Sequence, residues 1–290
     1  MKRLSVSNAL VAIILGLCAI AAVFPFYQTL VLSFSTILDW KAGGVTLFPR
    51  SIDLSSYRYI FHEGKVVNGL LISVIVTVLG TLVNLVVTTT GAYALSKNSM
   101  PGRNVILTCI IFTMFFSGGL IPYYLTIQAL HLQNNLLVMV LPVAVNAFNL
   151  ILMKNFFGTI SPALEESAKI DGANDLSILI RIVMPVSLPI MATMTLFYAV
   201  DRWNEWWLPM LFINDANLHP LQLVLRDTIT NMSHSMNSAI GQQLAAQMPN
   251  VYPEAVKSAM IIVSALPIVM VYPFVQKHFN AGVMIGSVKE

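Results

Sequence analysis

The sequence has little charge and almost no cysteine. Charged residues make up 10% of the 290 residues, whereas hydrophobic residues make up 57%. Water-soluble domains carry about 25% charged residues, so this composition excludes an ordinary soluble fold and indicates a membrane protein. The two cysteines, Cys18 and Cys109, both lie in apolar runs, which excludes a disulfide framework. A net charge of +3 is too balanced for a protein that binds nucleic acid.

Motifs for hydrolysis and for metal binding are also missing. No run matches G-x-x-x-x-G-K-[ST], so we expect this chain neither to hydrolyse ATP nor to bind a cofactor of its own. The five histidines lack a His-x-x-x-His spacing and have no cysteine near them in the sequence, so no metal site is expected. Because no Gly-x-Ser-x-Gly elbow occurs either, an intramembrane enzyme is only a third alternative.

Long uncharged stretches make up most of the sequence. Five of them can each hold a helix of about 20 apolar residues: they cover residues 4–38, 67–96, 104–153, 182–200 and 258–276. The third is 50 residues long, and a polar patch at 128–135 divides it into two spans. We therefore predict an all-α polytopic fold, one transmembrane domain over residues 1–290. Its six spans lie at about 9–35, 67–96, 104–128, 136–154, 183–207 and 256–277.

The distribution of lysine and arginine predicts the orientation. With the N-terminus in the cytoplasm, basic residues are roughly twice as dense in the cytoplasmic segments as in the outer ones, as the positive-inside rule requires. Six spans then place the C-terminus in the cytoplasm too. The long segments become a cytoplasmic loop at 155–182 and extracellular loops at 39–66 and 208–254.

The cytoplasmic loop carries the signals of two short helices separated by a turn. Ser161 is suited to cap a helix that Pro162 begins, and two acidic residues follow near the positive end of its dipole. Asp171-Gly172 predicts the helix stop, and Asn174 can cap a second helix that runs to Pro185. The residues alone leave open whether this loop is a solvated connector or a docking element.

A family resemblance favours the docking element. The run Glu166-Ser-Ala-Lys-Ile-Asp-Gly-Ala173 resembles the cytoplasmic "EAA" loop of permease subunits of binding-protein-dependent ABC importers. Ser167 and Met184 depart mildly from the usual alanine and leucine of that loop. The similarity extends over nearly the whole chain, through Asn68, Trp203-Asn204 and the tail from Phe279 to Lys289. It is greatest to the carbohydrate-uptake branch, which includes a maltose permease subunit and polysaccharide-oligomer relatives.

The resemblance implies a fold, partners and site residues. The fold is that of a type I ABC importer permease, in a bacterial cytoplasmic membrane, and this chain would form half of a pore for a sugar or oligosaccharide. Its partners would be a second, non-identical permease, two cytoplasmic ATPase subunits that hold ATP-Mg, and an extracellular solute-binding protein. The implied ATPase-coupling residues are Glu165, Glu166, Ala168, Asp171, Gly172 and Ala173 in the loop, with Gly282, Gly286 and Ser287 in the tail.

Polar residues within the apolar spans indicate a substrate path, because such groups normally face a cavity rather than lipid. The candidates are Asn84, Asn146, Asn149, Trp203, Asn204 and Glu205. Amides, carboxylates and indoles suit the hydroxyls and the C–H faces of sugars. Alternatively, the tryptophans form an interfacial belt, Asp201 pairs with Arg202, and Asn84 holds neighbouring helices together. A self-sufficient secondary transporter is the second alternative, but it would need mid-membrane carboxylates that these spans lack.

Overall fold

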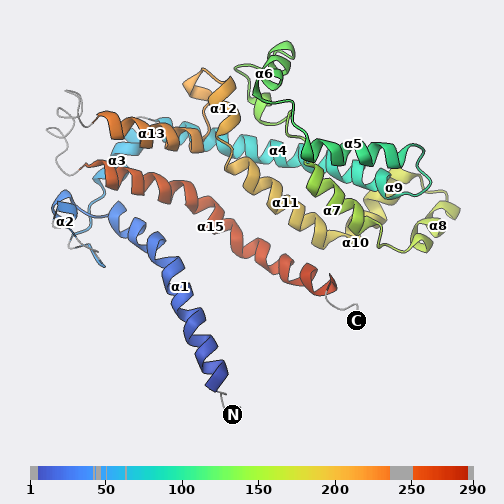
Figure 1. Cartoon of the computed structure of the whole chain (residues 1–290), viewed down its shortest axis with the longest axis horizontal. Coiled ribbons are helices and arrows are strands. Elements are labelled where there is room, and N and C mark those ends of the chain that lie inside the picture. The colour runs from blue at the N-terminus through green and yellow to red at the C-terminus, as the bar shows by residue number, and fades with distance from the viewer. Residues whose placement is uncertain are drawn as a thin grey trace. The chain divides into compact units, whose positions relative to one another are not determined.

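The computed structural model describes residues 6–41, 43, 47–49, 51–62, 64–235 and 251–286. These residues form helices and connecting segments, with no strand among them (Figure 1), so the predicted all-α fold is confirmed. The chain divides into two compact units, one of residues 1–67 and 224–267 and the other of residues 68–223 and 268–290. That the whole chain acts as one transmembrane domain stays a prediction.

The first unit contains α1 (Val6–Ser33), α2 (Ile37–Lys41), α3 (Ser55–His62), most of α13 (Leu221–Ser235) and the first part of α15 (Pro253–Gly286). The second unit contains nearly all of α4 (Lys65–Ser96), then α5 (Arg103–Phe115), α6 (Leu120–Ala129), η1 (Leu136–Met139), α7 (Ala147–Phe157), α8 (Pro162–Ile170) and α9 (Asp175–Ile178). It continues with the π-helix η2 (Leu179–Val183), α10 (Met184–Val186), α11 (Leu188–Trp203), α12 (Trp207–Phe212) and η3 (Ala216–Leu218).

Among the described residues, fewer unbroken spans occur than the six that the apolar stretches predict. By length and composition, three helical stretches of the described chain can cross a membrane: Leu10–Ser33, Lys65–Ser96 and Pro253–Val271. Two more candidates are bent pairs, α5 with α6 at 119° and Asp175–Val186 with Leu188–Phe212 at 89°. The apolar helix α7 has only 11 residues. The described residues therefore hold up to five candidate spans besides α7.

Two of the breaks in the expected spans have local causes. The span expected at 104–128 is interrupted between α5 and α6, where Gly119 has a φ of 85° that glycine reaches without a steric penalty. The span expected at 136–154 is not helical at 140–146, a segment that includes Pro142. Proline has no N–H to donate and clashes with the preceding helical turn, so a continuous helix is unfavourable there.

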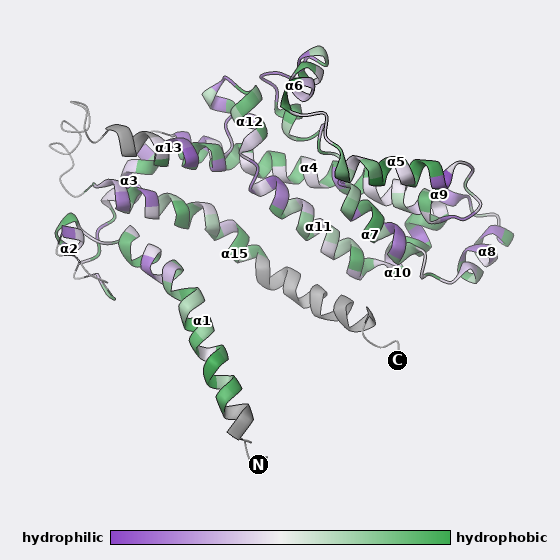
Figure 2. Ribbon diagram, viewed as in Figure 1, coloured by the Kyte–Doolittle hydropathy of each residue, from purple (hydrophilic) through white to green (hydrophobic). Residues whose placement is uncertain are grey.

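Helix α1 is apolar on all sides and exposed. Every side chain from Leu10 to Phe26 is exposed, and Figure 2 shows this helix as predominantly hydrophobic. A helix that is hydrophobic all round belongs in lipid or against another apolar protein surface. Helix α1 therefore supports the membrane location that the composition indicates.

Aromatic contacts hold the C-terminal end of α1. The Tyr57 hydroxyl donates to Ser33 Oγ at 2.9 Å, and its ring stacks on Phe34 with the centroids 5.1 Å apart. The Trp40 and Tyr252 rings lie 5.5 Å apart. Burial, and then the nearby acidic residues, raise the pKa of Tyr252 to about 12, so this phenol stays neutral at physiological pH.

The second unit has two apolar clusters along α4. The first core cluster consists of Ala92, Tyr93, Met153, Phe157, Ile178, Leu179, Val183, Ile190, Met194 and Tyr198. The second core cluster consists of Ile72, Val76, Ile127, Leu132, Val138, Met139, Leu208, Phe212 and Ile213. The first joins the C-terminal half of α4 to α7, α9, η2 and α11, so loop 155–182 is continuous with this core.

Buried polar groups hold the non-helical segment 140–146. Asn84 is fully buried and donates from Nδ2 to the Val143 carbonyl at 2.6 Å. Arg202 is 8% exposed and donates to the carbonyl of Met139 at 3.0 Å. Irregular backbone at membrane depth is tolerated only where it is buried in protein or lines a cavity. These two side chains supply part of that burial.

The ion pair between Asp201 and Arg202 that the sequence suggests is not formed. Within the described part of the chain, no ion pair joins these two residues, and the Arg202 guanidinium donates to the Met139 carbonyl instead. Its aliphatic stem lies directly on α4 at Gly80, where an added Cβ would be 2.8 Å from Arg202 Cδ and 2.9 Å from Cγ. A side chain at position 80 would therefore force the Arg202 side chain to shift.

The C-terminal segment that carries the two tail glycines is helical. Helix α15 continues to Gly286, so Gly282 and Gly286 are helical rather than part of an extended tail. Glycine lowers helix stability without preventing helix formation, and the apolar residues around it favour continuation. Ser287 lies outside the described residues.

Candidate functional site

Helix α8 begins at Pro162, as the sequence predicts, but without the side-chain cap. Ser161 occupies the N-cap position, yet its hydroxyl accepts no capping hydrogen bond. Instead, the backbone carbonyl of Ser161 accepts from the N–H of Leu164 at 3.2 Å. The expected capping role of the Ser161 hydroxyl is therefore wrong, because a backbone group already satisfies that donor.

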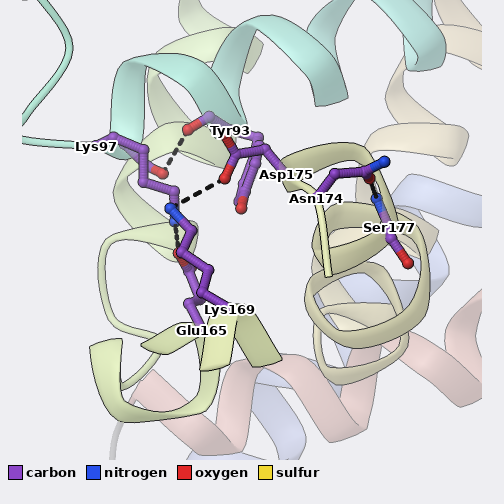
Figure 3. A network of polar contacts seen from close by, with 8 residues as sticks. Tyr93, Lys97, Glu165, Lys169, Asn174, Asp175 and Ser177 are labelled. Atoms are coloured by element: carbon purple, nitrogen blue, oxygen red, sulfur yellow. Dashed lines mark hydrogen bonds and ion pairs between the residues drawn. The ribbon is translucent and has the colours of Figure 1, made fainter. Parts of the chain in front are cut away.

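The turn after α8 has the hydrogen bonds of a Schellman motif. Gly172 has a φ of 83°, the Gly172 N–H donates to the Lys169 carbonyl at 3.0 Å, and the Ala173 N–H donates to the Ala168 carbonyl at 2.9 Å. The side chain of Asn174 then caps α9 by accepting from the Ser177 N–H at 2.8 Å (Figure 3). The predicted helix stop and second cap are both confirmed.

The turn gives a prediction about Gly172. An added Cβ would meet no atom within 4 Å, so any cost of substitution is conformational and not steric. We expect Gly172→Val to destabilise the turn by about 1–2 kcal/mol, because a β-branched residue disfavours positive φ. Hydrogen exchange at the amides of residues 172 and 173 should speed up in this variant. Asparagine tolerates positive φ, so Gly172→Asn is the control, and equal exchange in both variants would contradict a strained turn.

The predicted coupling residues divide between two faces of α8. Glu165 and Ala168 are half-buried, and Ala168 and Ala173 pack against the first core cluster. The outward face of α8 consists of Ala163, Glu166, Ser167 and Ile170, all exposed. Ile170 is 86% exposed. Asp171 and Gly172 are exposed beside this face. Positions 163, 166, 167 and 170 share one side because the helix repeats every 3.6 residues.

An ion pair fixes the inward face of α8. The Lys97 ammonium group, just after α4, pairs with the Glu165 carboxylate and lies 4.2 Å from the centre of the Tyr93 ring (Figure 3). A second pair, between Lys169 and Asp175 at 3.1 Å, is much more exposed. Sequence analysis missed Lys97, because nothing in its local pattern indicates a partner in α8.

A pocket of about 450 Å³ lies between α7 and α11. It is lined by Asn146, Phe148, Asn149, Leu196, Phe197, Val200 and Asp201. Asn146 is held in place because its Oδ1 caps α7, accepting from the Asn149 N–H at 3.1 Å. Behind the pocket, the buried Tyr198 hydroxyl lies 2.7 Å from the Thr88 hydroxyl of α4.

The structure brings two of the predicted substrate-path residues, Asn146 and Asn149, together in this pocket. It also adds Asp201, the first residue of the polar and aromatic cluster at 201–207 that holds three of the candidates, and Phe197, which sequence analysis did not select. Their spacing of four residues on one helix could have indicated them, since such residues share a face.

The other four predicted path residues do not line the pocket, and each has a structural contact. Asn84 joins α4 to segment 140–146. Trp203 is buried. The Asn204 amide donates to the Val200 carbonyl at 2.9 Å. The Glu205 carboxylate accepts from the N–H groups of Trp207 and Leu208 at 2.9 and 3.0 Å, which stabilises the N-terminus of α12. Their role toward substrate stays a prediction.

Comparisons with known proteins place these features in a family. Residues 88–285 match the model for the binding-protein-dependent transport system inner membrane component. The polygalacturonan/rhamnogalacturonan transport system permease protein YtcP of Bacillus subtilis (strain 168) is 42% identical over 272 residues, which cover 93% of this chain and 94% of that protein. Protein LplC of the same organism is 41% identical over 276 residues, covering 95% and 92%.

A solved structure agrees with these relatives. In the crystal structure of a bacterial ABC transporter involved in the import of the acidic polysaccharide alginate, one chain matches with a TM-score of 0.88 and 35% identity. The match covers 96% of the present chain and 100% of that one. The chain therefore belongs to the family of binding-protein-dependent transport system inner membrane components, and it is a multi-pass permease subunit of an ABC importer.

Proposed function

We propose that this chain forms half of the pore of an oligosaccharide importer, and that an ATPase drives it by docking on the outward face of α8. The observation that carries the proposal is this face itself, with Ile170 86% exposed next to the exposed Glu166. A large exposed aliphatic side chain beside a carboxylate is suited to an interface, because it offers apolar area and a charge-assisted hydrogen bond together.

The proposed partners follow the organisation of the family. They are a second, non-identical permease subunit, two ATPase subunits that bind ATP-Mg, and an extracellular solute-binding protein, with both termini of this chain in the cytoplasm. A second permease is supported by the pocket, which is open on one side, where Phe148 is 57% exposed. One chain thus supplies one wall of a path, and a neighbouring subunit would supply the other.

The pocket chemistry supports a saccharide as the substrate. Asn146, Asn149 and Asp201 can bind hydroxyl groups, while Phe148 and Phe197 can pack against the C–H faces of sugar rings. One relative is named for polygalacturonan/rhamnogalacturonan transport, and the similar solved structure is of a transporter involved in the import of the acidic polysaccharide alginate. We propose an oligosaccharide of this general class, whose hydroxyl-bearing side faces this subunit.

The docking face and the pocket are joined by helices that follow one another directly in the chain. Helix α8 leads through the Gly172 turn into α9, η2 and α10, and then, across the bend of 89° at Ser187, into α11, which carries Asp201. Helices α9 and η2 pack into the first core cluster together with α11. ATPase closure would therefore move this packed group as a rigid body, the form that most transporter switching takes.

The test of the substrate proposal uses Asn149→Ala and Asp201→Asn in the complex with its native partners. We expect both variants to lower oligosaccharide-stimulated ATP hydrolysis by about tenfold, the usual effect of losing a buried hydrogen bond to a bound ligand. Basal hydrolysis should remain near that of the unchanged complex. The control is Thr195→Ala, an exposed residue of α11 that does not line the pocket, and an equal loss in this control would contradict substrate binding at the pocket.

A further inference from the structure

The ion pair between Lys97 and Glu165 joins segments that are 68 residues apart in the sequence. Lys97 directly follows α4, and Glu165 lies in the first turn of α8. The Lys97 side chain is 28% exposed and the Glu165 side chain 13% exposed. The contact therefore attaches the docking helix to the end of the longest helix of the second unit.

Lys97 is held from both sides. Its ammonium group lies 4.2 Å from the centre of the Tyr93 ring, one turn earlier on α4, which adds a cation–π contact (Figure 3). The connection after it is fixed as well, because Arg103 Nε donates to the Leu95 carbonyl at 2.8 Å. The ammonium group is therefore positioned before α8 meets it, which reduces the entropy lost in forming the pair.

A second attachment lies beside the ion pair. Ala168, on the same face of α8 as Glu165, packs against the first core cluster, to which Tyr93 belongs. Small side chains allow the helix to approach closely, and the ion pair then fixes its direction. Glu165 faces α4, whereas its neighbour Glu166 faces outward.

Helix α4 leads from this attachment to the pocket. Thr88, about two and a half turns before Lys97, makes the 2.7 Å hydroxyl contact with Tyr198 of α11. Tyr198 is 1% exposed and Thr88 is fully buried. A movement of α8 can thus reach the pocket wall through α4 as well as through the chain connection from α9 to α11.

We propose that Lys97 and Glu165, seated on Tyr93, are positioning residues that fix the docking helix to α4 and transmit ATPase movement to it. This inference rests on the proposed function. It assigns the two neighbouring carboxylates different tasks: Glu166 binds the ATPase, and Glu165 holds the helix from inside. The more exposed pair of Lys169 and Asp175 has the same chemistry but little expected effect, since exposed pairs contribute little.

The test measures substrate molecules imported per ATP hydrolysed, with Lys97→Met, Glu165→Gln and the exchanged pair Lys97→Glu with Glu165→Lys. Both single variants should still assemble with the ATPase and hydrolyse ATP, while import per ATP falls by about tenfold, a typical coupling effect. The exchanged pair should recover part of the loss, because it restores the ion pair with reversed charges but loses the cation–π contact with Tyr93. The matched control, Lys169→Met with Asp175→Asn, should change the ratio by less than about twofold.

Three outcomes would overturn the inference. Loss of ATPase binding by Glu165→Gln would make Glu165 a docking residue. No recovery by the exchanged pair, or an equal loss in the control, would remove the specific role of the pair. The proposed function would fail differently, since the unchanged complex would then show no ATP-dependent import.

A second measurement applies if the single variants fold poorly. Cysteines at positions 97 and 165, in a chain carrying Cys18→Ser and Cys109→Ser, can be joined by a bifunctional thiol reagent. We expect coupled import to be low before crosslinking and to recover after it, because the link replaces the ion pair. Complete loss of import after crosslinking would show that the contact must open, which contradicts a fixed attachment.

Discussion

Replacing Glu166 by arginine and Ile170 by aspartate together is expected to remove the ATPase from the purified complex. Both residues lie on the outward face of α8, and Ile170 is 86% exposed. Interfaces depend on a few central contacts, and losing two of them weakens binding on the order of 100-fold or more. Size-exclusion chromatography of the complex, with ATP-driven import measured on the same samples, checks this result.

The control for this double variant is Leu130→Asp, which also places an acidic group on an exposed apolar position of the second unit. Leu130 is 61% exposed and follows α6, far along the chain from the docking loop. This variant should retain its ATPase. If the Glu166 and Ile170 variant also kept the ATPase and imported substrate at the unchanged rate, the docking role of the outward face would be wrong.

Replacing Gly80 by alanine is expected to destabilise the chain, although alanine normally favours a helix. The new Cβ would lie 2.8 Å from Arg202 Cδ, and the Arg202 guanidinium is tied to the Met139 carbonyl. Overpacking of this kind costs about 1–3 kcal/mol, and breaking the buried hydrogen bond adds a similar amount. Thermal unfolding in detergent should therefore begin at a lower temperature.

A matched substitution on the same helix makes the sign of this effect testable. At Gly91 an added Cβ would lie 3.4 Å from Leu150 Cδ1, which is an ordinary contact distance. Gly91→Ala should therefore leave stability unchanged or raise it by about 0.5–1 kcal/mol through helix propensity. Equal unfolding temperatures for the two variants would contradict the close packing of Arg202 on α4.

Local features of the docking loop were predictable from the sequence. The stop at Gly172 and the cap by Asn174 depend on residues within one turn of each other, and both occur in the structure. The cap by Ser161 failed for an equally local reason, because a backbone carbonyl took the donor. The division of Glu165 and Glu166 between two faces needed the position of Lys97, which only tertiary structure provides.

For the membrane spans too, the sequence indicates one property and not another. Hydropathy finds apolar stretches, but it does not report where a helix bends, as between α5 and α6. In the pocket, Asn146 and Asn149 were predictable because amides are rare in apolar spans. The capping contact of Glu205 could not be predicted in the same way, because Glu205 lies in a polar and aromatic cluster whose composition also suits substrate binding.

Import into sealed vesicles tests the ATP-driven mechanism most directly. The complex containing this chain, purified from native membranes with its partners, is reconstituted with ATP inside and the binding protein with oligosaccharide outside. We expect import that requires both ATP and the binding protein, continues after ionophores remove all ion gradients, and stops in the Glu166 and Ile170 variant. Import by this chain alone, driven by an ion gradient and independent of ATP, would contradict the mechanism and make the chain a secondary transporter.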